Sequence, residues 1–242
     1  MQFLRAATLA VAPNVQFITE TNVPLAENLS YFGEQNEAHM IYNFSLAPVL
    51  AHALLSGNVS ALRRCFTRLP SAPVGCAYFN FTSSHDGIGL RPAESLLDET
   101  EIQKLIDHAH KMGGEVSWRR TQNNELKAYE LNVTLASFLQ ESFDGEHAMG
   151  LQRFTLCQGF AMSIEGIPAI YIQAVFAAFN DRAGFEESGI ARRLNRKRWS
   201  YHEAECQLTS DRAEKRHSSN SRCCCTSGKA SPRFIQMPRS TP

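Results

Sequence analysis

The sequence lacks a net charge, and it lacks any long apolar run. Its 242 residues include 24 basic and 24 acidic side chains, so the formal net charge at pH 7 is zero. A balanced charge gives no reason to expect nucleic acid or an anionic membrane as a partner. No apolar run approaches the roughly 20 residues that a bilayer-spanning helix needs. These absences leave an ordinary soluble globular protein, with neither nucleic acid nor a membrane among its partners.

The cysteines lack the spacing of a metal site. None of the seven forms a CxxC pair, and no histidine stands at a metal-ligand offset from them. Cys65, Cys76, Cys157 and Cys206 occur singly, and three more form the run 223–225. Free thiols in a reducing compartment explain this pattern better than zinc or disulfides do. We expect no metal and no cofactor.

The first residues lack a targeting signal. Leu4, Ala7 and Val11 recur at helical spacing, and no basic leader precedes a long apolar core. The segment therefore predicts an amphipathic helix, and we expect the protein in the cytoplasm.

The body of the chain alternates strand-like and helix-like segments. Strands are predicted at 14–20, 39–44, 77–84 and 166–172, with a short one at 128–134. Helices are predicted at 45–57, ending on Gly57, at 98–113, where Asp98 and Glu101 resemble a capping box, and at 146–164. Continuous apolar strands separated by helices favour an α/β fold with a parallel sheet. We place one domain at 1–216, and residues 217–242, rich in Ser, Pro, Arg and Cys, are predicted to be a disordered or aberrant tail.

Polar side chains stand where two of these strands end. Glu20 ends the first strand, and His85 and Asp86 follow the third, directly before Gly87. Asp-Gly is a common turn dipeptide, so a simple turn is one interpretation. In parallel sheets, however, polar residues at the carboxyl ends of strands carry the chemistry. The sequence thus predicts a site at one sheet edge.

Several motifs, in this order, make the chain resemble the second half of the sucrose phosphorylase group. They are "ITETNVPLAENLSYFG", "EAHMIYNFSLAPVLAHALLSG", "FTSSHDGIGLRPAESLL", "GIPAIYI" and "RRLNRKRW". The group lies in the α-amylase clan, glycoside hydrolase family 13, and the resemblance runs from about residue 2 to 205. It implies a (β/α)8 TIM barrel, here a partial barrel of about strands five to eight. It also implies phosphorolysis of an α-glucoside, with inorganic phosphate as the second substrate.

The same resemblance implies roles for individual residues. Glu20 matches the general acid/base, and Asp86 matches the carboxylate that stabilises the transition state. His85 and Arg192 match residues that hold the glucosyl unit. Retaining enzymes of this kind need an acid and a nucleophile about 5 Å apart. Gly87 is expected to let its loop pass close to the sugar.

The resemblance also implies a gap. The nucleophilic Asp belongs to the fourth barrel strand, which we expect before residue 1. Arg119 and Arg120 lie in a predicted loop where acceptors bind in this group, and their guanidinium groups suit an anionic acceptor or phosphate. A solvated basic turn explains the pair equally well. For the whole chain, an α-glucoside hydrolase and an inactive remnant stay open as alternatives.

Overall fold

The computed structural model describes residues 1–121 and 123–209. The chain divides into a compact unit, Met1–Lys197, and a second unit that begins at Arg198. The tail predicted at 217–242 lies outside the described residues. The helices of the first unit are α1 (Gln2–Val11), α2 (Leu25–Ser30), α3 (Leu46–Ser56), α4 (Ser60–Arg68), α5 (Glu99–Lys111), α6 (Leu135–Phe138), α7 (Gly150–Ser163), α8 (Ile172–Val175) and α9 (Arg182–Ser188), with 3-10 turns η1 (Arg91–Ala93) and η2 (Ala191–Asn195). In the second unit, the described residues include α10 (Tyr201–Thr209).

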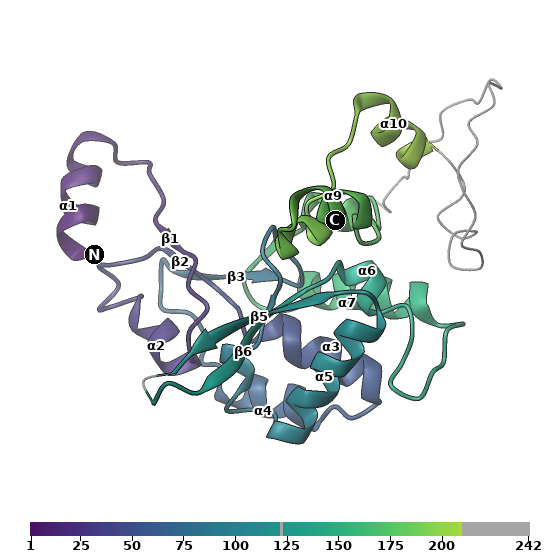
Figure 1. Cartoon of the computed structure of the whole chain (residues 1–242). Coiled ribbons are helices and arrows are strands. Elements are labelled where there is room, and N and C mark those ends of the chain that lie inside the picture. The colour runs from purple at the N-terminus through teal and green to yellow at the C-terminus, as the bar shows by residue number, and fades with distance from the viewer. Residues whose placement is uncertain (122, 210–242) are drawn as a thin grey trace, which may run out of the picture. The chain divides into compact units, whose positions relative to one another are not determined.

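Four parallel strands form the main sheet. They are β1 (Ile18–Thr19), β2 (Met40–Tyr42), β3 (Ala77–Phe81) and β7 (Ile167–Ala169). Their spatial order is β1-β2-β3-β7, and each neighbouring pair is parallel. Spatial order therefore follows chain order, with helices in the connections, as in one arc of a β/α barrel (Figure 1). The predicted parallel sheet is confirmed.

The last strand of this sheet is more exposed than the sequence predicts. Segment 166–172 reads as a buried strand, but Ile167 is 44% exposed and Ile170 is 46% exposed. The cause is position, because β7 is a sheet edge and pairs only with β3 among the described strands. At the opposite edge, Ile18 on β1 is 43% exposed. An apolar run predicts a strand well, but it does not predict what covers that strand.

A second, antiparallel sheet replaces the predicted acceptor loop. Its strands are β4 (Ile88–Gly89), β5 (Glu115–Arg120) and β6 (Leu126–Asn132), in the order β4-β6-β5. Ser117 pairs with Glu130 whereas Trp118 pairs with Ala128, so Tyr129 is an extra residue that forms a bulge. The segment predicted as a loop is thus a β-hairpin, and its second strand, β6, overlaps the short strand predicted at 128–134. The hairpin lies against α5 (Figure 1).

Helix α3 lies at the centre of the larger apolar core. Nine of its residues are buried, including Val49 and Leu50, and it ends on Gly57 in the left-handed conformation at φ 71°. Glycine adopts this conformation without steric cost, which is why it ends helices so often.

Two predicted helix features have different outcomes. Asp98 and Glu101 form the predicted capping box at the start of α5, with each side chain bound to the other residue's backbone. Helix α1 forms as predicted, but none of its residues is buried, and Val11 is 85% exposed. Among the described residues, no helix combines the length and the hydropathy that crossing a membrane requires.

Candidate active site

Three of the predicted site residues lie together. Glu20 follows β1, and His85 and Asp86 follow β3, so all three stand at the carboxyl edge of the parallel sheet. The Nε2 atom of His85 is 3.8 Å from Oε1 of Glu20 and 3.7 Å from Oδ1 of Asp86. The side chain of His85 is 54% exposed, that of Glu20 is 39% exposed and that of Asp86 is 23% exposed, so a solute can reach all three. The structure therefore brings an imidazole and two carboxylates together at an open edge.

Two arginines meet the Asp86 carboxylate. Nη1 of Arg192 lies 2.8 Å from its Oδ1 atom, and Nη2 of Arg196 lies 3.0 Å from the same atom. Arg196 also donates from Nε to the backbone carbonyl of His85 at 2.6 Å. Arg192 was predicted, whereas Arg196, four residues further along the same motif, was missed.

These arginines also bear on metal binding. The ligand atoms of Glu20, His85 and Asp86 lie within 4.8 Å of one another, a spacing that could hold a metal ion. Two guanidinium groups on one Asp86 oxygen repel a cation and occupy the oxygen it needs. This donor set suits a neutral, hydroxyl-rich ligand or an anion better than a metal.

A buried carboxylate, Glu130, holds the other side of Arg192. Glu130 lies on β6 and is only 3% exposed. Its two oxygens accept from Nε of Arg192 at 3.0 Å and from Nη2 at 3.3 Å. Burial alone would lower the pKa of Arg192, but the hydrogen bond to Glu130 and the charges of Glu130 and Asp86 outweigh it and raise that pKa. Arg192 is therefore a permanent cation between two carboxylates.

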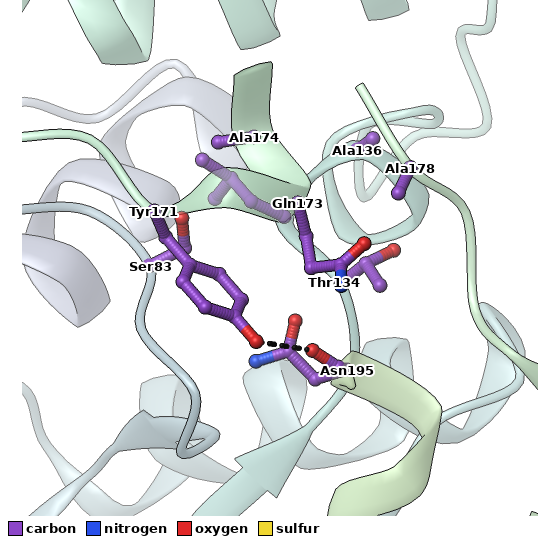
Figure 2. Close-up of a pocket in the computed structure, with 9 residues that line it drawn as sticks. Ser83, Thr134, Ala136, Tyr171, Gln173, Ala174, Ala178 and Asn195 are labelled. Atoms are coloured by element: carbon purple, nitrogen blue, oxygen red, sulfur yellow. Dashed lines mark hydrogen bonds between the residues drawn. The ribbon is translucent and has the colours of Figure 1, made fainter. Parts of the chain in front are cut away.

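Asn195 holds the loop that carries His85 and Asp86. It is 3% exposed, and its side-chain amide donates to the carbonyls of Ser84 at 2.6 Å and Asp86 at 2.7 Å. The Tyr171 hydroxyl in turn donates to the Asn195 carbonyl at 3.0 Å, as Figure 2 shows. These hydrogen bonds hold the loop at residues 84–86 in place.

A small, partly open pocket lies beside Asn195 (Figure 2). Its lining residues are Ser83, Thr134, Leu135, Ala136, Tyr171, Gln173, Ala174, Ala178 and Asn195. Two of the lining residues are Ser83, which precedes Ser84 in the loop, and Asn195, which binds the Ser84 carbonyl. We regard it as part of the loop's support.

The two glycines after Asp86 pack against protein. A Cβ at Gly87 would lie 2.3 Å from the Leu131 carbonyl oxygen, and one at Gly89 would lie 2.8 Å from the side-chain amide of Asn22. Asn22, the last residue of the "ETN" motif, donates to the carbonyl of Tyr129 at 3.4 Å. Without a Cβ, these glycines let the loop lie directly on β6 and on the segment that follows β1. The expected approach of the loop to a sugar stays a prediction.

Tyr42 contributes a phenol close enough to Glu20 for their charges to interact. It stacks among aromatic rings of β2 and β3, with ring centroids 4.7 Å from Phe79 and 5.1 Å from Phe81. Burial and the nearby Glu20 carboxylate raise the pKa of Tyr42, so the phenol stays protonated at neutral pH.

Arg119 and Arg120 lie apart from this cluster. Arg119 donates to Glu94 at 2.8 Å, and Arg120 donates to Asn124 at 2.9 Å. Consecutive residues of a strand point to opposite faces, and accordingly Arg119 is partly buried while Arg120 is exposed. The two guanidinium groups therefore lie on opposite faces of β5, and their predicted contact with an anionic acceptor or phosphate stays a prediction.

The sequence has related proteins of known activity, although no family model matches it. It is 40% identical to glucosylglycerate phosphorylase of Escherichia coli over 90% of this chain, and 37% identical to the enzyme of that name from Spirochaeta thermophila over 83%. It is 29% identical to the sucrose phosphorylase of Streptococcus mutans over 68% of this chain. The aligned region makes up 39%, 34% and 32% of those three proteins, so the chain spans about a third to two fifths of their length.

A solved structure shows the same fold. The crystal structure of sucrose 6F-phosphate phosphorylase from Thermoanaerobacter thermosaccharolyticum matches with a TM-score of 0.73 and 18% identity. The match covers 89% of this chain and 42% of that one. The predicted partial barrel is confirmed. The chain is a relative of the sucrose phosphorylase group over about nine tenths of its own length, and it has part of that group's α-amylase-type barrel.

Proposed function

We propose that the protein acts in reversible phosphorolysis of an α-glucoside, which yields α-D-glucose 1-phosphate with retention at the anomeric carbon. The observation that carries this proposal is the cluster of Glu20, His85 and Asp86 at the carboxyl edge of the sheet. Two carboxylates beside an imidazole and a fixed arginine can supply the acid and the stabilising groups of glucosyl transfer, which also needs a nucleophile.

We further propose glucosylglycerate as the substrate. Three relatives named glucosylglycerate phosphorylase are 37 to 40% identical to this chain. Relatives named sucrose phosphorylase are 24 to 29% identical. The higher identity favours an acceptor that carries a carboxylate.

In the proposed mechanism, Glu20 donates its proton to the glycosidic oxygen while a carboxylate nucleophile bonds to the anomeric carbon and the glycosidic bond breaks. In the second half-reaction phosphate bonds to the anomeric carbon and displaces that carboxylate, and the Glu20 carboxylate takes the proton of the attacking phosphate, which restores the acid. Asp86 accepts hydrogen bonds from ring hydroxyls, and the positive charge that develops on the sugar strengthens them. His85 and Arg192 hold the same glucosyl unit. We assign the nucleophile to no described residue.

A direct test is to incubate the protein with glucosylglycerate and inorganic phosphate and to measure glucose 1-phosphate. Glu20→Gln should lower turnover at least about 100-fold, because it removes the proton donor. Glu27→Gln, at an exposed carboxylate on the neighbouring helix α2, is the matched control and should not change turnover. Near-normal turnover in Glu20→Gln would refute the assignment.

The same assay separates the alternatives. Release of free glucose without any need for phosphate would identify an α-glucoside hydrolase. If the wild-type chain forms neither glucose 1-phosphate nor free glucose, the result would favour the inactive remnant.

For the acceptor side, we propose that Arg119 and Arg120 act separately on an anionic substrate. Arg120 is exposed, whereas Arg119 is already paired with Glu94. Arg120→Ala should therefore raise the Michaelis constant for phosphate or glucosylglycerate more than Arg119→Ala does. Unchanged constants in both variants would mean that neither arginine takes part in substrate binding. A cytoplasmic location is part of the same proposal, because phosphorolysis needs inorganic phosphate.

A further inference from the structure

Glu130 is a buried carboxylate whose position no turnover step explains. It lies in the middle of β6, between Tyr129 and Leu131, and is 3% exposed. Both of its oxygens bind Arg192, at 3.0 Å from Nε and 3.3 Å from Nη2. These are the hydrogen bonds that the Glu130 side chain makes with the described residues.

A carboxylate in this position requires a cation. Removing a charged carboxylate from water is costly unless a paired, hydrogen-bonded partner compensates for it. The arrangement is side-on, with two guanidinium nitrogens facing two carboxylate oxygens, which is the strongest geometry for this pair. Glu130 is the fixed half of the pair, because it is 3% exposed whereas the Arg192 side chain is 39% exposed.

Arg192 has one terminal nitrogen left, and that nitrogen faces the site. Nη1 lies 2.8 Å from Oδ1 of Asp86. Since the guanidinium group is planar, fixing Nε and Nη2 against Glu130 also fixes the direction of Nη1. Glu130 therefore determines where the positive charge beside Asp86 stands.

The loop that carries Asp86 also packs on Glu130. A Cβ at Gly87 would lie 2.7 Å from Cγ of Glu130, so the loop that carries Asp86 rests directly on the Glu130 side chain. Gly89, two residues further on, pairs with Glu130 across the sheet. One side chain thus supports both the arginine and the loop that the arginine meets.

We propose that Glu130 is a positioning residue, which orients the Arg192 guanidinium group against Asp86 for binding of the glucosyl unit. The inference rests on the proposed function for the identity of the ligand. The orientation of Arg192 itself does not depend on that function.

The test has two arms, both on the 242-residue chain with Glu130→Gln. The first measures hydrogen exchange at the arginine Nε–H groups by NMR, with Arg192→Ala and Arg120→Ala used to assign the two signals. In the wild type, Arg192 should exchange more than about tenfold more slowly than exposed Arg120. In Glu130→Gln the two rates should become similar. The second arm measures binding of α-D-glucose 1-phosphate by calorimetry, and Glu130→Gln should weaken it by about tenfold or more.

Glu146→Gln is the matched control, because it removes the carboxylate from the Glu146–Arg153 pair elsewhere on the chain. It should leave both Arg192 exchange and glucose 1-phosphate binding unchanged. A merely structural role for Glu130 would lower the melting temperature without accelerating Arg192 exchange well below that temperature.

The two proposals fail differently. Fast Arg192 exchange in the wild type, or slow exchange that survives Glu130→Gln, overturns the positioning role, and the wild-type measurement decides even if the variant does not fold. Slow exchange lost in Glu130→Gln, together with no wild-type binding of glucose 1-phosphate, supports the positioning role and counts against the proposed function.

Discussion

Gly87 is the residue at which the structure makes its sharpest stability prediction. Built on the existing backbone, a Cβ there lies 2.3 Å from the carbonyl oxygen of Leu131, 2.7 Å from its carbonyl carbon and 2.7 Å from Cγ of Glu130. Two of these three atoms are backbone atoms of β6, so rotation of a side chain cannot relieve the overlap. Gly87→Ala must move either the loop that carries Asp86 or the strand beneath it.

The expected cost follows from overpacking. Extra methyl groups in a well-packed region cost about 1–3 kcal/mol when the backbone must shift. The matched control is Gly159→Ala in α7, where a Cβ meets nothing within 4 Å. Alanine is preferred over glycine within helices by about 0.5–1 kcal/mol, so this variant should be more stable than the wild type.

Urea unfolding monitored by circular dichroism measures both changes. The same Gly-to-Ala substitution should lower the free energy of unfolding at position 87 and raise it at position 159. In thermal unfolding, each kcal/mol should correspond to about 2–4 °C for a chain of this size. A Gly87→Ala variant as stable as the wild type would refute the close packing of the loop on β6.

Three further predictions concern buried polar groups. Burial lowers the pKa of His52 and His108 below the ordinary 6.5, so protonation of these side chains favours the unfolded chain. The free energy of unfolding should therefore fall as the pH drops from about 6.5 toward 5. His108→Gln should make this pH dependence weaker in urea titrations. An equally steep dependence in His108→Gln would contradict this. Burial raises the pKa of Cys157 to about 12, so iodoacetamide at pH 8 should label it in the native chain at least about 100-fold more slowly than partly exposed Cys206, and peptide mass spectrometry would show equal labelling if this is wrong. Asn195→Leu leaves two carbonyls without their donor and should cost roughly 2–4 kcal/mol in urea unfolding, with faster proteolysis of the loop at 84–86; unchanged proteolysis would mean that other contacts hold the loop.

Features set by neighbours along the chain were predictable from the sequence. The capping box of Asp98 and Glu101 and the left-handed Gly57 depend on residues within one helical turn, and both are confirmed. The meeting of Glu20 with His85 and Asp86 was also predictable, since parallel strands bring their carboxyl ends to one edge. This prediction rests on the topology of the parallel sheet and does not require the three residues to be close in the sequence.

Contacts between distant segments were not predictable in the same way. Glu130 meets Arg192 across 62 positions, and Arg196 meets Asp86 across 110. A lone carboxylate in a strand-like run such as "AYELN" is the only local signal, and it does not name its partner. The hairpin of β5 and β6 was read as a loop because its first strand, "EVSWRR", is too polar to show a buried alternation. The exposure of β7 depends on the sheet edge, which no residue of the strand itself reveals.

The register of β6 limits where this hairpin can change in length. Glu130 faces Ser117 on one side and Gly89 on the other. Side chains alternate along a strand, so deleting Leu131 would turn Glu130 to the opposite face relative to Asn132 and leave Arg192 without its carboxylate. Insertions at the hairpin tip, between β5 and β6, and loss of the extra residue at Tyr129 both keep Glu130 opposite Ser117. Among natural relatives, length variation in this segment should therefore gather at the tip and at the bulge and spare the stretch from Glu130 to Asn132.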